Sequence, residues 1–331
     1  MNLRYTTIFT VSAIFFFGAL AGWFFTRPEQ EKNQPEACLS EQLSRQLKHE
    51  QYAYLSRRIF VENQNDVLIN FLPLREALHE YVDKQNSKVG VYFEYLPSGI
   101  SVGVNDKKEV EVASLSKVPI VMSIFKKIER GEISLSDIIM IEEKNLDRKF
   151  GTLWKKGAGI NLSVEELVRL ALIESDNTAY NALFDRLTIP EINEVYENLD
   201  IVMNQEEGRE GEKETYAIVS PKNYSSIFRS LYLSSFLLEE HSNFILKLLT
   251  QTAFNDKIPA GVGKNIPVAH KIGIFTRTDA SRDVFTDCGI IYVPNRPYIL
   301  CTFVLDTDKK AQEHIALISK MIYGFIIKVQ K

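Results

Sequence analysis

The most informative stretch of this chain is Ser114-Leu115-Ser116-Lys117. It follows a partly apolar, strand-like run at 109–113 and opens the apolar segment 118–125, so it is predicted at the start of a helix. Ser and Lys three residues apart then place a hydroxyl beside an amine that can take its proton. The positive end of the helix dipole also stabilises negative charge near the serine oxygen. The pattern predicts a nucleophile that carries its own base.

Two further segments follow in the order that an acylating serine enzyme needs, Ser175-Asp176-Asn177 and Lys271-Ile272-Gly273. Each has an ordinary structural interpretation when taken alone. The first is typical of a turn or a helix N-cap, and the lysine of the second is compatible with an exposed edge strand. A lone Ser-x-x-Lys usually marks a solvated helix face. The functional hypothesis therefore depends on the three segments occurring together.

Together the three segments resemble the S-x-x-K, S-D-N and K-T-G signatures of the penicillin-recognising serine hydrolases, most closely the class A β-lactamases. The first two match fully. Ile272 stands where the family has Thr, which removes one hydroxyl that would help to hold a substrate carboxylate. The likeness covers the chain from about Asp66 to the C-terminus. It includes the segments Gly131-Glu132-Ile133-Ser134-Leu135, Asn177-Thr178-Ala179, Ser220-Pro221 and Ile258-Pro259-Ala260-Gly261.

Hydrophobic spacing predicts strands at both ends of the globular part and helices between them. The predicted strands are 89–96, 100–105, 268–274, 287–293 and 298–306; the predicted helices are 71–84, 118–130, 222–233, 240–253, 309–329 and one that a capping box opens at Ser163. This order predicts an α+β fold, in which N- and C-terminal segments form one antiparallel sheet beside a helical lobe. The resemblance implies that the sheet has five strands. The cleft between sheet and lobe is the predicted site.

The resemblance implies a catalytic role for four motif residues. Ser114 attacks an amide carbonyl to form an acyl-enzyme, and Lys117, as a neutral amine, accepts its proton. Burial and the positive Lys271 are expected to lower the pKa of Lys117. Ser175 passes a proton to the leaving nitrogen, while Lys271 holds the Ser175 hydroxyl and supplies a positive field for a substrate carboxylate.

Substrate-binding residues are implied in the same way. Asn177 hydrogen-bonds the amide side chain of the substrate. On the strand segment that carries Gly273, the N–H of Ile274 forms an oxyanion hole with the N–H of the nucleophile. Arg277 or Arg282 supplies a second carboxylate contact, and the sequence does not choose between them.

Two aromatic residues, Phe150 and Trp154, precede the second motif in a Gly-flanked loop. They either gate the substrate or pack the loop.

The water-activating glutamate of class A enzymes has no evident counterpart in this chain. Those enzymes carry it in an E-x-x-L-N loop, and no such string exists here. The segment 204–215 offers several glutamates instead, of which Glu210 and Glu212 are the candidates. The same segment has the composition of a solvated acidic loop. Without a glutamate in place, the acyl-enzyme would hydrolyse slowly.

Three hypotheses for the activity follow from the resemblance. The fuller motif likeness favours a β-lactamase, which hydrolyses a cyclic amide and confers antibiotic resistance. The second is a penicillin-binding D,D-peptidase or related cell-wall amidase, for which β-lactams are inhibitors. The third is a membrane-tethered sensor in which acylation without turnover is the signal. The expected substrate is a small-molecule β-lactam or a peptidoglycan-like molecule.

The N-terminus begins with the uncharged run 5–26, flanked by Arg4 and Arg27. This run is long enough to cross a bilayer as a helix. It is either an uncleaved signal anchor or a signal peptide cut after Ala19-Leu20-Ala21, and the apolar residues that continue past this point favour the anchor. Both alternatives place the catalytic domain on the extracytoplasmic side of the membrane.

The predicted organisation has three parts. Residues 1–27 form the transmembrane anchor, residues 28–65 a polar linker with a juxtamembrane helix at 39–62, and residues 66–331 the serine hydrolase domain. The linker is rich in Gln and Glu and cannot build a core of its own.

Composition and residue spacing exclude other classes of protein. The chain has 331 residues, 45% of them hydrophobic and 25% charged, so it can bury a large core. A net charge of -4 argues against a nucleic-acid partner. The five histidines are scattered, so no metal and no cofactor is predicted. His270 adjoins Lys271, but strand alternation directs its side chain to the opposite face, which favours a structural role.

The cysteines predict little covalent cross-linking. Cys288 and Cys301 are equally distant from the predicted turn at Pro294-Asn295, so they are expected to face each other across two strands. An exported domain is compatible with a disulfide, yet directly paired strand residues seldom reach its geometry, which favours two thiols. Cys38 stands alone in the linker, where it can bridge two chains.

Overall fold

The computed structural model describes Tyr54 and residues 69–111, 113–199, 201, 203–205, 215–276 and 283–328, with side chains except at 203–205 and 215–217. The chain divides into two compact units, Met1–Gln51 and Tyr52–Lys331, and every described residue belongs to the second. The predicted anchor, Cys38 and most of the linker lie outside the described residues, so the boundaries at 27 and 65 stay predictions. No helix in the described part has the length and apolar content that a membrane crossing requires.

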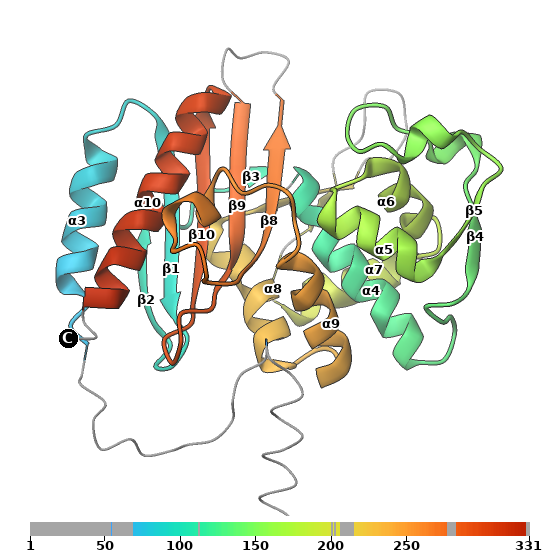
Figure 1. The fold of residues 1–331 in the computed structure, drawn as a ribbon, viewed down its shortest axis with the longest axis horizontal. Coiled ribbons are helices and arrows are strands. Elements are labelled where there is room, and N and C mark those ends of the chain that lie inside the picture. Colours follow the sequence, from blue (N-terminus) through green and yellow to red (C-terminus); the bar gives the residue numbers. More distant parts are fainter. Residues whose placement is uncertain are drawn as a thin grey trace, which may run out of the picture. The chain divides into compact units, whose positions relative to one another are not determined.

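A five-stranded antiparallel sheet of order β2-β1-β10-β9-β8 forms the framework of the second unit (Figure 1). Its strands are β1 (Lys88–Tyr95), β2 (Ile100–Val104), β8 (Val268–Phe275), β9 (Asp283–Ile291) and β10 (Tyr298–Asp306). Two strands come from the N-terminal part and three from the C-terminal part, which confirms the predicted α+β arrangement. β8 lies at one edge of the sheet, next to the helical lobe (Figure 1).

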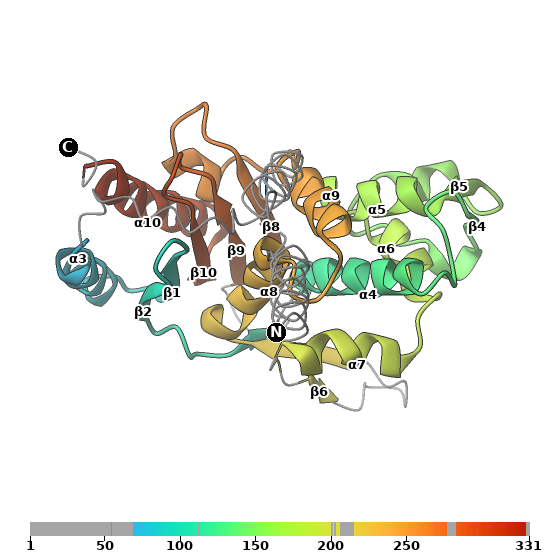
Figure 2. The same ribbon diagram turned by 90° about the horizontal axis from the view of Figure 1, so that it is seen from below.

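Helices cover both faces of the sheet. The helices α3 (Leu72–Asp83) and α10 (Asp308–Lys328) lie on one face, and α8 (Pro221–Leu233) packs against the other (Figure 2). Alternation along each strand divides the sheet side chains between two hydrophobic clusters, one on each face. The cluster under α10 includes fully buried isoleucines of that helix at 315, 318, 322 and 326.

The helical lobe lies beside β8 and is built around α4 (Lys117–Glu129). Its other helices are α5 (Val164–Ile173), α6 (Asn177–Phe184), α7 (Ile189–Asn198) and α9 (Glu239–Leu249). All residues of α4 from Lys117 to Phe125 are buried, as expected for a helix without a polar face. Ser163 caps α5, since its hydroxyl accepts a hydrogen bond from the Glu166 N–H at 3.1 Å, which confirms the predicted cap.

Two small sheets were not predicted. One contains β3 (Val110–Glu111), β7 (Thr215–Val219) and β6 (Met203–Gln205), and the other pairs β4 (Ile138–Met140) with β5 (Asn161–Ser163). Most of these strands span two or three residues, which is too short for a pattern of alternation to stand out. β3 leads towards Ser114, so its pairing with β7 fixes the direction from which the chain enters the site.

The cysteine prediction needs one correction. The register places Cys288 of β9 directly opposite Cys301 of β10, as expected. The structure joins them in a disulfide, with their Cα atoms 4.0 Å apart, whereas two thiols were predicted. The backbone pairing of β9 with β10 brings the two side chains to the same face of the sheet, so the bridge links strands that already pair.

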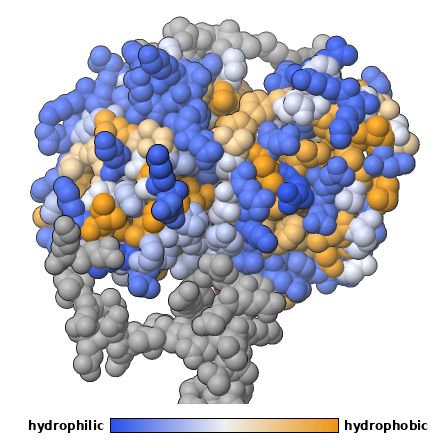
Figure 3. Space-filling model, in the orientation of Figure 1, coloured by the Kyte–Doolittle hydropathy of each residue, from blue (hydrophilic) through white to orange (hydrophobic). Residues whose placement is uncertain are grey.

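Polar residues predominate on one face of the described domain. Figure 3 shows hydrophilic residues over most of the visible face, with apolar residues along the edge where β4 and β5 lie. Ile138 and Met140 of β4 are 62% and 52% exposed. This apolar edge lies on the far side of the lobe from the sheet (Figure 1), so it is separate from the cleft beside β8.

Candidate active site

Ser114 lies in a 3₁₀ turn, η1 (Ala113–Ser116), immediately before α4. Ala113 has a φ of 45°, in the left-handed region, so the chain turns sharply as it leaves β3. Ser114 is half-buried, whereas the neighbouring Leu115 is fully buried and its carbonyl accepts a 2.8 Å hydrogen bond from the Tyr224 hydroxyl. The turn is thus held from its inner side while the serine stays accessible.

Lys117 is the first residue of α4, and its amine is buried beside the serine. Nζ donates to Ser114 Oγ at 3.0 Å and to Asn177 Oδ1 at 2.7 Å. Burial lowers the pKa of Lys117 to about 8, while the negative charges of Asp176 and Asp147 partly oppose this change. A substantial fraction of neutral amine is therefore present near physiological pH, and it lies within hydrogen-bond reach of the hydroxyl.

Ser175 joins α5 to α6 and faces the same cleft. Its φ of 57° is in the left-handed region, which only a short polar residue or glycine adopts readily, and such strain is common at functional positions. The fully buried Ser175 hydroxyl accepts a 2.7 Å hydrogen bond from Nζ of Lys271. The next residue, Asp176, caps α6 by accepting from the Ala179 N–H at 3.0 Å. The predicted helix cap and the predicted site residue are thus neighbours in one motif.

Asp176 also holds the loop before the second motif. Its Oδ2 accepts from the N–H groups of Thr152 and Leu153 at 2.7 and 2.8 Å. A Cβ at Gly151 would lie 2.1 Å from this oxygen, and Gly151 has a φ of 88°, so glycine is required there. The loop carbonyl of Phe150 in turn accepts from the Asn177 N–H at 3.1 Å.

Lys271 lies on β8 with 1% of its surface exposed. Its pKa is well below the ordinary value, first because of burial and then because the ammonium of Lys117 is close; the carboxylate of Asp287 opposes the shift. The centre of the Phe254 ring lies 5.9 Å from Nζ, and this ring packs in a tilted arrangement against the Phe150 ring, with the ring centroids 5.8 Å apart. Two amines in one buried cleft repel each other, so a positive charge on one disfavours a positive charge on the other.

The free edge of β8 completes the site. The Thr286 hydroxyl donates to the Gly273 carbonyl at 3.1 Å, so this carbonyl points towards β9. Backbone groups of consecutive strand residues point in opposite directions, and the Ile274 N–H therefore points to the open edge, where η1 lies. This direction agrees with the oxyanion role implied for Ile274.

The structure brings most of the implied residues together. They form two hydrogen-bonded groups in one cleft, Ser114–Lys117–Asn177 and Ser175–Lys271, with Phe150 at the border. Trp154 instead packs near the cations of Arg148 and Lys155, whose distances to its ring are 5.6 and 5.9 Å. Four candidates, Glu210, Glu212, Arg277 and Arg282, lie outside the described residues.

Two aromatic side chains of the site were not predicted from the sequence. The Tyr180 ring lies 5.1 Å from Nζ of Lys117, and the Phe254 ring borders Lys271. Tyr180 follows Asn177 by three residues on one helix, so helical spacing alone was a usable signal for it. Phe254 follows α9 in an irregular segment, and no sequence pattern indicated its place.

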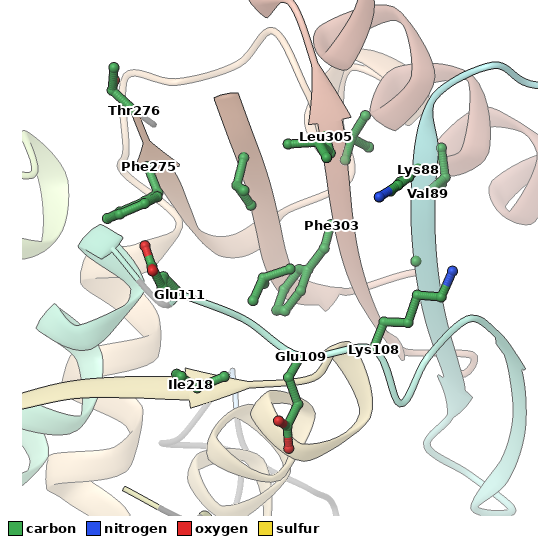
Figure 4. Close-up of a pocket in the computed structure, with 14 residues that line it drawn as sticks. Lys88, Val89, Lys108, Glu109, Glu111, Ile218, Phe275, Thr276, Phe303 and Leu305 are labelled. Carbon is green, nitrogen blue, oxygen red and sulfur yellow. The ribbon is translucent and has the colours of Figure 1, made fainter. Parts of the chain in front are cut away.

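A separate cavity of about 780 Å³ lies beside the catalytic cleft. Figure 4 shows the apolar side chains of Phe275, Phe303 and Leu305 on its sheet side, with Lys88 and Lys108 together at one end. It borders the site through Glu111 and Phe275, but none of the hydrogen-bonded cleft residues lines it. The cavity is thus a neighbour of the catalytic centre and not part of it.

Comparison with known proteins identifies the family of this chain. A family profile described as "Beta-lactamase enzyme family" matches residues 73–326, which is most of the chain. The chain belongs to the β-lactamase enzyme family. It is a serine hydrolase of the class A β-lactamase type, as the motif resemblance predicted.

Individual relatives of this β-lactamase-family enzyme are distant. A β-lactamase from Phocaeicola vulgatus is 26% identical over 258 residues, covering 70% of this chain and 80% of the relative. A β-lactamase from Bacteroides uniformis is 25% identical over 282 residues, with 80% and 90% covered. A mutant of PBP-A, solved as an acyl-enzyme complex with penicillin G, is 26% identical, with a TM-score of 0.68 over 77% of this chain and 97% of PBP-A.

Proposed function

We propose that Ser114 is the nucleophile that opens a β-lactam ring and becomes acylated, with Lys117 as its general base. The observation that carries the proposal is the 3.0 Å hydrogen bond from Nζ of Lys117 to Ser114 Oγ, made by a buried amine whose pKa is about 8. The neutral amine takes the hydroxyl proton as the oxygen attacks the carbonyl carbon. The N–H groups of Ser114 and Ile274 stabilise the oxyanion.

The second serine–lysine pair acts on the leaving group and on the substrate carboxylate. Ser175 delivers a proton to the departing nitrogen, and the Lys271 ammonium orients this hydroxyl and attracts the carboxylate. A bound carboxylate favours the charged form of Lys271. Because the two amines repel each other, it also favours the neutral form of Lys117 that catalysis needs. Asn177 binds the amide side chain, and Arg277 or Arg282 is the second carboxylate contact.

Deacylation requires a group that activates water. Within the described residues, no carboxylate hydrogen-bonds to Ser114 or to the Lys117 amine, whose partners are Ser114 and Asn177. We assign this role to Glu210 or Glu212, which stand in the segment joining β6 to β7. The strand that follows this segment, β7, pairs with β3 just before Ser114, and this pairing supports the assignment.

Nitrocefin turnover by the extracytoplasmic part of the chain tests the β-lactamase proposal. Many turnovers per enzyme are expected, and Glu210→Gln or Glu212→Gln should slow them and lead to an acyl-enzyme visible by intact mass. Glu206→Gln, in the same segment, is the matched control and should behave as the wild type. Turnover unaffected by either substitution would remove both glutamates from the mechanism.

The alternative is acylation without turnover, as in a D,D-peptidase inhibited by β-lactams or in a sensor. One observation favours it: a mutant of the similar PBP-A was solved as an acyl-enzyme complex with penicillin G. It predicts one equivalent of nitrocefin opened per enzyme, followed by a stable adduct on Ser114. Release of D-Ala from a peptidyl-D-Ala-D-Ala substrate then separates the peptidase from the sensor.

We further propose that residues 1–27 anchor the enzyme in a membrane with the hydrolase domain on the extracytoplasmic side. The uncharged run 5–26 between Arg4 and Arg27 supports this proposal. Protease added to intact cells or spheroplasts should remove the catalytic domain while the anchor stays in the membrane fraction. A domain that is degraded only after lysis would show that the proposal is wrong.

A further inference from the structure

A buried carboxylate lies behind the strand that carries Lys271. Asp287 of β9 is opposite Ile272 in the β8–β9 register, so its side chain shares a face with those of Ile272 and His270, away from the cleft. Its Oδ1 lies 2.8 Å from Nδ1 of His270, and its Oδ2 accepts from the Ile258 N–H at 2.9 Å. One fully buried side chain thus joins β8, β9 and the 3₁₀ turn η4 (Ile258–Gly261).

His270 contacts Asp287 through Nδ1, and its Nε2 is buried without a hydrogen-bond partner. The imidazole therefore ties the carboxylate to the strand that carries Lys271.

No lysine or arginine among the described residues bonds to the Asp287 carboxylate. The Thr302 hydroxyl of β10 bonds to the Asp287 carbonyl at 3.2 Å, and Ser319 of α10 bonds to the Ile258 carbonyl at 2.7 Å, so both contacts are neutral. Lys257, which precedes η4, pairs with Asp256 at 3.1 Å. The cation whose charge Asp287 stabilises is Lys271, on the other side of the sheet.

Lys271 needs such support because its own side of the sheet disfavours a cation. There it faces the Lys117 amine from α4, the neutral Ser175 hydroxyl and the Phe254 ring. Burial and Lys117 both lower the pKa of Lys271, and Asp287 is the group that raises it. Loss of the Asp287 charge therefore makes the ammonium harder to keep in the cleft.

We infer that Asp287 is a positioning residue for Lys271. It fixes β8 from behind and supplies the negative charge that keeps Lys271 an ammonium, able to hold Ser175 and a substrate carboxylate. The inference rests on the role proposed for Lys271, and it makes a residue outside the cleft a determinant of recognition for substrates that carry a carboxylate.

Asp287→Asn tests the inference, with Asp306→Asn as the matched control. Asp306 is also a buried aspartate of the same sheet, at the end of β10, where it bonds to Ser87 and to the Thr307 N–H at 2.7 Å. The measurement is the second-order rate of Ser114 acylation, followed by intact mass from pH 6 to 10. The two probes are benzylpenicillin, which carries a carboxylate, and its methyl ester, which does not.

In Asp287→Asn, the fall of the acylation rate at alkaline pH (the alkaline limb of the pH–rate profile) should occur at lower pH with benzylpenicillin, by roughly half a pH unit or more. The acylation rate at pH 8 should fall by about threefold or more. The rate with the methyl ester should change less than about twofold, and Asp306→Asn should leave the limb where the wild type has it. An unmoved limb, or an equal loss with both probes, would show a merely structural role and overturn the inference.

Two further outcomes have a definite meaning. If Asp287→Asn does not fold, Asp287→Ser replaces it. If neither uncharged variant folds while Asp306→Asn does, the carboxylate serves the fold itself and the inference is overturned. If the wild type is not acylated at all, the proposed function fails and takes the inference with it, whereas acylation with an unmoved limb overturns the inference alone.

Discussion

Two serine–lysine pairs in the cleft share their chemistry but differ in how the chain brings them together. Ser114 and Lys117 are three residues apart at the junction of η1 and α4, whereas Ser175 and Lys271 are 96 residues apart and meet only where the lobe packs against β8. Both amines are buried, and burial is the first cause of the lowered pKa of each. In the proposed mechanism, the local pair supplies the nucleophile and its base, and the distant pair protonates the leaving group and binds the substrate carboxylate.

The charges around the two lysines differ as well. Lys117 is near the negative charges of Asp176 and Asp147, both in the lobe, while Lys271 has Lys117 in front of it and Asp287 behind. The first lysine is therefore better supported as a cation in the free enzyme. We therefore expect the carboxylate of a bound substrate to act mainly on the protonation of Lys271.

Removal of the proposed nucleophile should have the largest effect on acylation. Ser114→Ala should abolish covalent acylation, because Ser175 is fully buried and its hydroxyl already accepts from Lys271. The measurement is the mass of the protein after incubation with a β-lactam. Ser116→Ala, in the same turn, is the control and should still gain the full mass of the adduct. An adduct that persists on Ser114→Ala would move the nucleophile to the other pair.

Replacing each lysine in turn measures how much each serine–lysine pair contributes to the acylation rate. Lys117→Met should lower the acylation rate by about 10³-fold, since the general base is lost, and Lys271→Met by about 10²-fold, since binding and proton delivery are weakened. Only the Lys271 variant should also lose its preference for substrates with a carboxylate. Equal losses in rate and preference would show that the two amines act as one unit.

Asp176 tests how far the distant pair depends on the loop that holds it. Asp176→Asn places an amide donor against at least one of the N–H groups of Thr152, Leu153 and Ala179, which should lower the free energy of unfolding by about 2–4 kcal/mol. Urea denaturation measures the loss. Asp137→Asn is the control, because this exposed carboxylate bonds only locally to Ser134, and it should change stability by less than about 1 kcal/mol.

The pH dependence of acylation separates the local pair from the distant one. With a β-lactam methyl ester, which does not need the Lys271 ammonium, the rate should rise about tenfold between pH 7 and pH 9. The reason is that Lys117 loses its proton around its pKa of about 8 and only the neutral amine is a base. A rate that is flat over this range, or that falls, would show that Lys117 does not act as the base.

Sequence reasoning predicted the large elements of the fold and the local pair. β10 matches its predicted limits, and α3, α8 and α10 begin and end within two residues of theirs, because their hydrophobic spacing is strong. It missed the two small sheets and predicted the start of β9 four residues late, at Asp287 instead of Asp283. Short strands are stabilised by their partners and not by their own residues, so their sequences give little signal.

The site, like the fold, was predicted only in part. The resemblance named Ser114, Lys117, Ser175, Asn177 and Lys271, and in the structure they form two hydrogen-bonded groups, one around each lysine. The aromatic neighbours Tyr180 and Phe254 were not named, because the motifs carry no information on what packs around them. Phe150 borders the cleft, whereas Trp154 packs on nearby cations. The sequence shows two aromatic residues in one loop and does not indicate which of them faces the cleft.

The Ser-x-x-Lys spacing is enough to bring a hydroxyl and an amine together at the start of α4, since one turn of helix fixes their distance whatever surrounds it. The basicity of that amine, and the residues that lie opposite it in the cleft, depend on how distant segments pack. Burial against the lobe lowers the pKa of Lys117, and packing of β8 delivers Lys271 to Ser175 with Asp287 behind it. Desolvation and charge interactions act through space, so they depend on contacts that no local stretch of the chain contains.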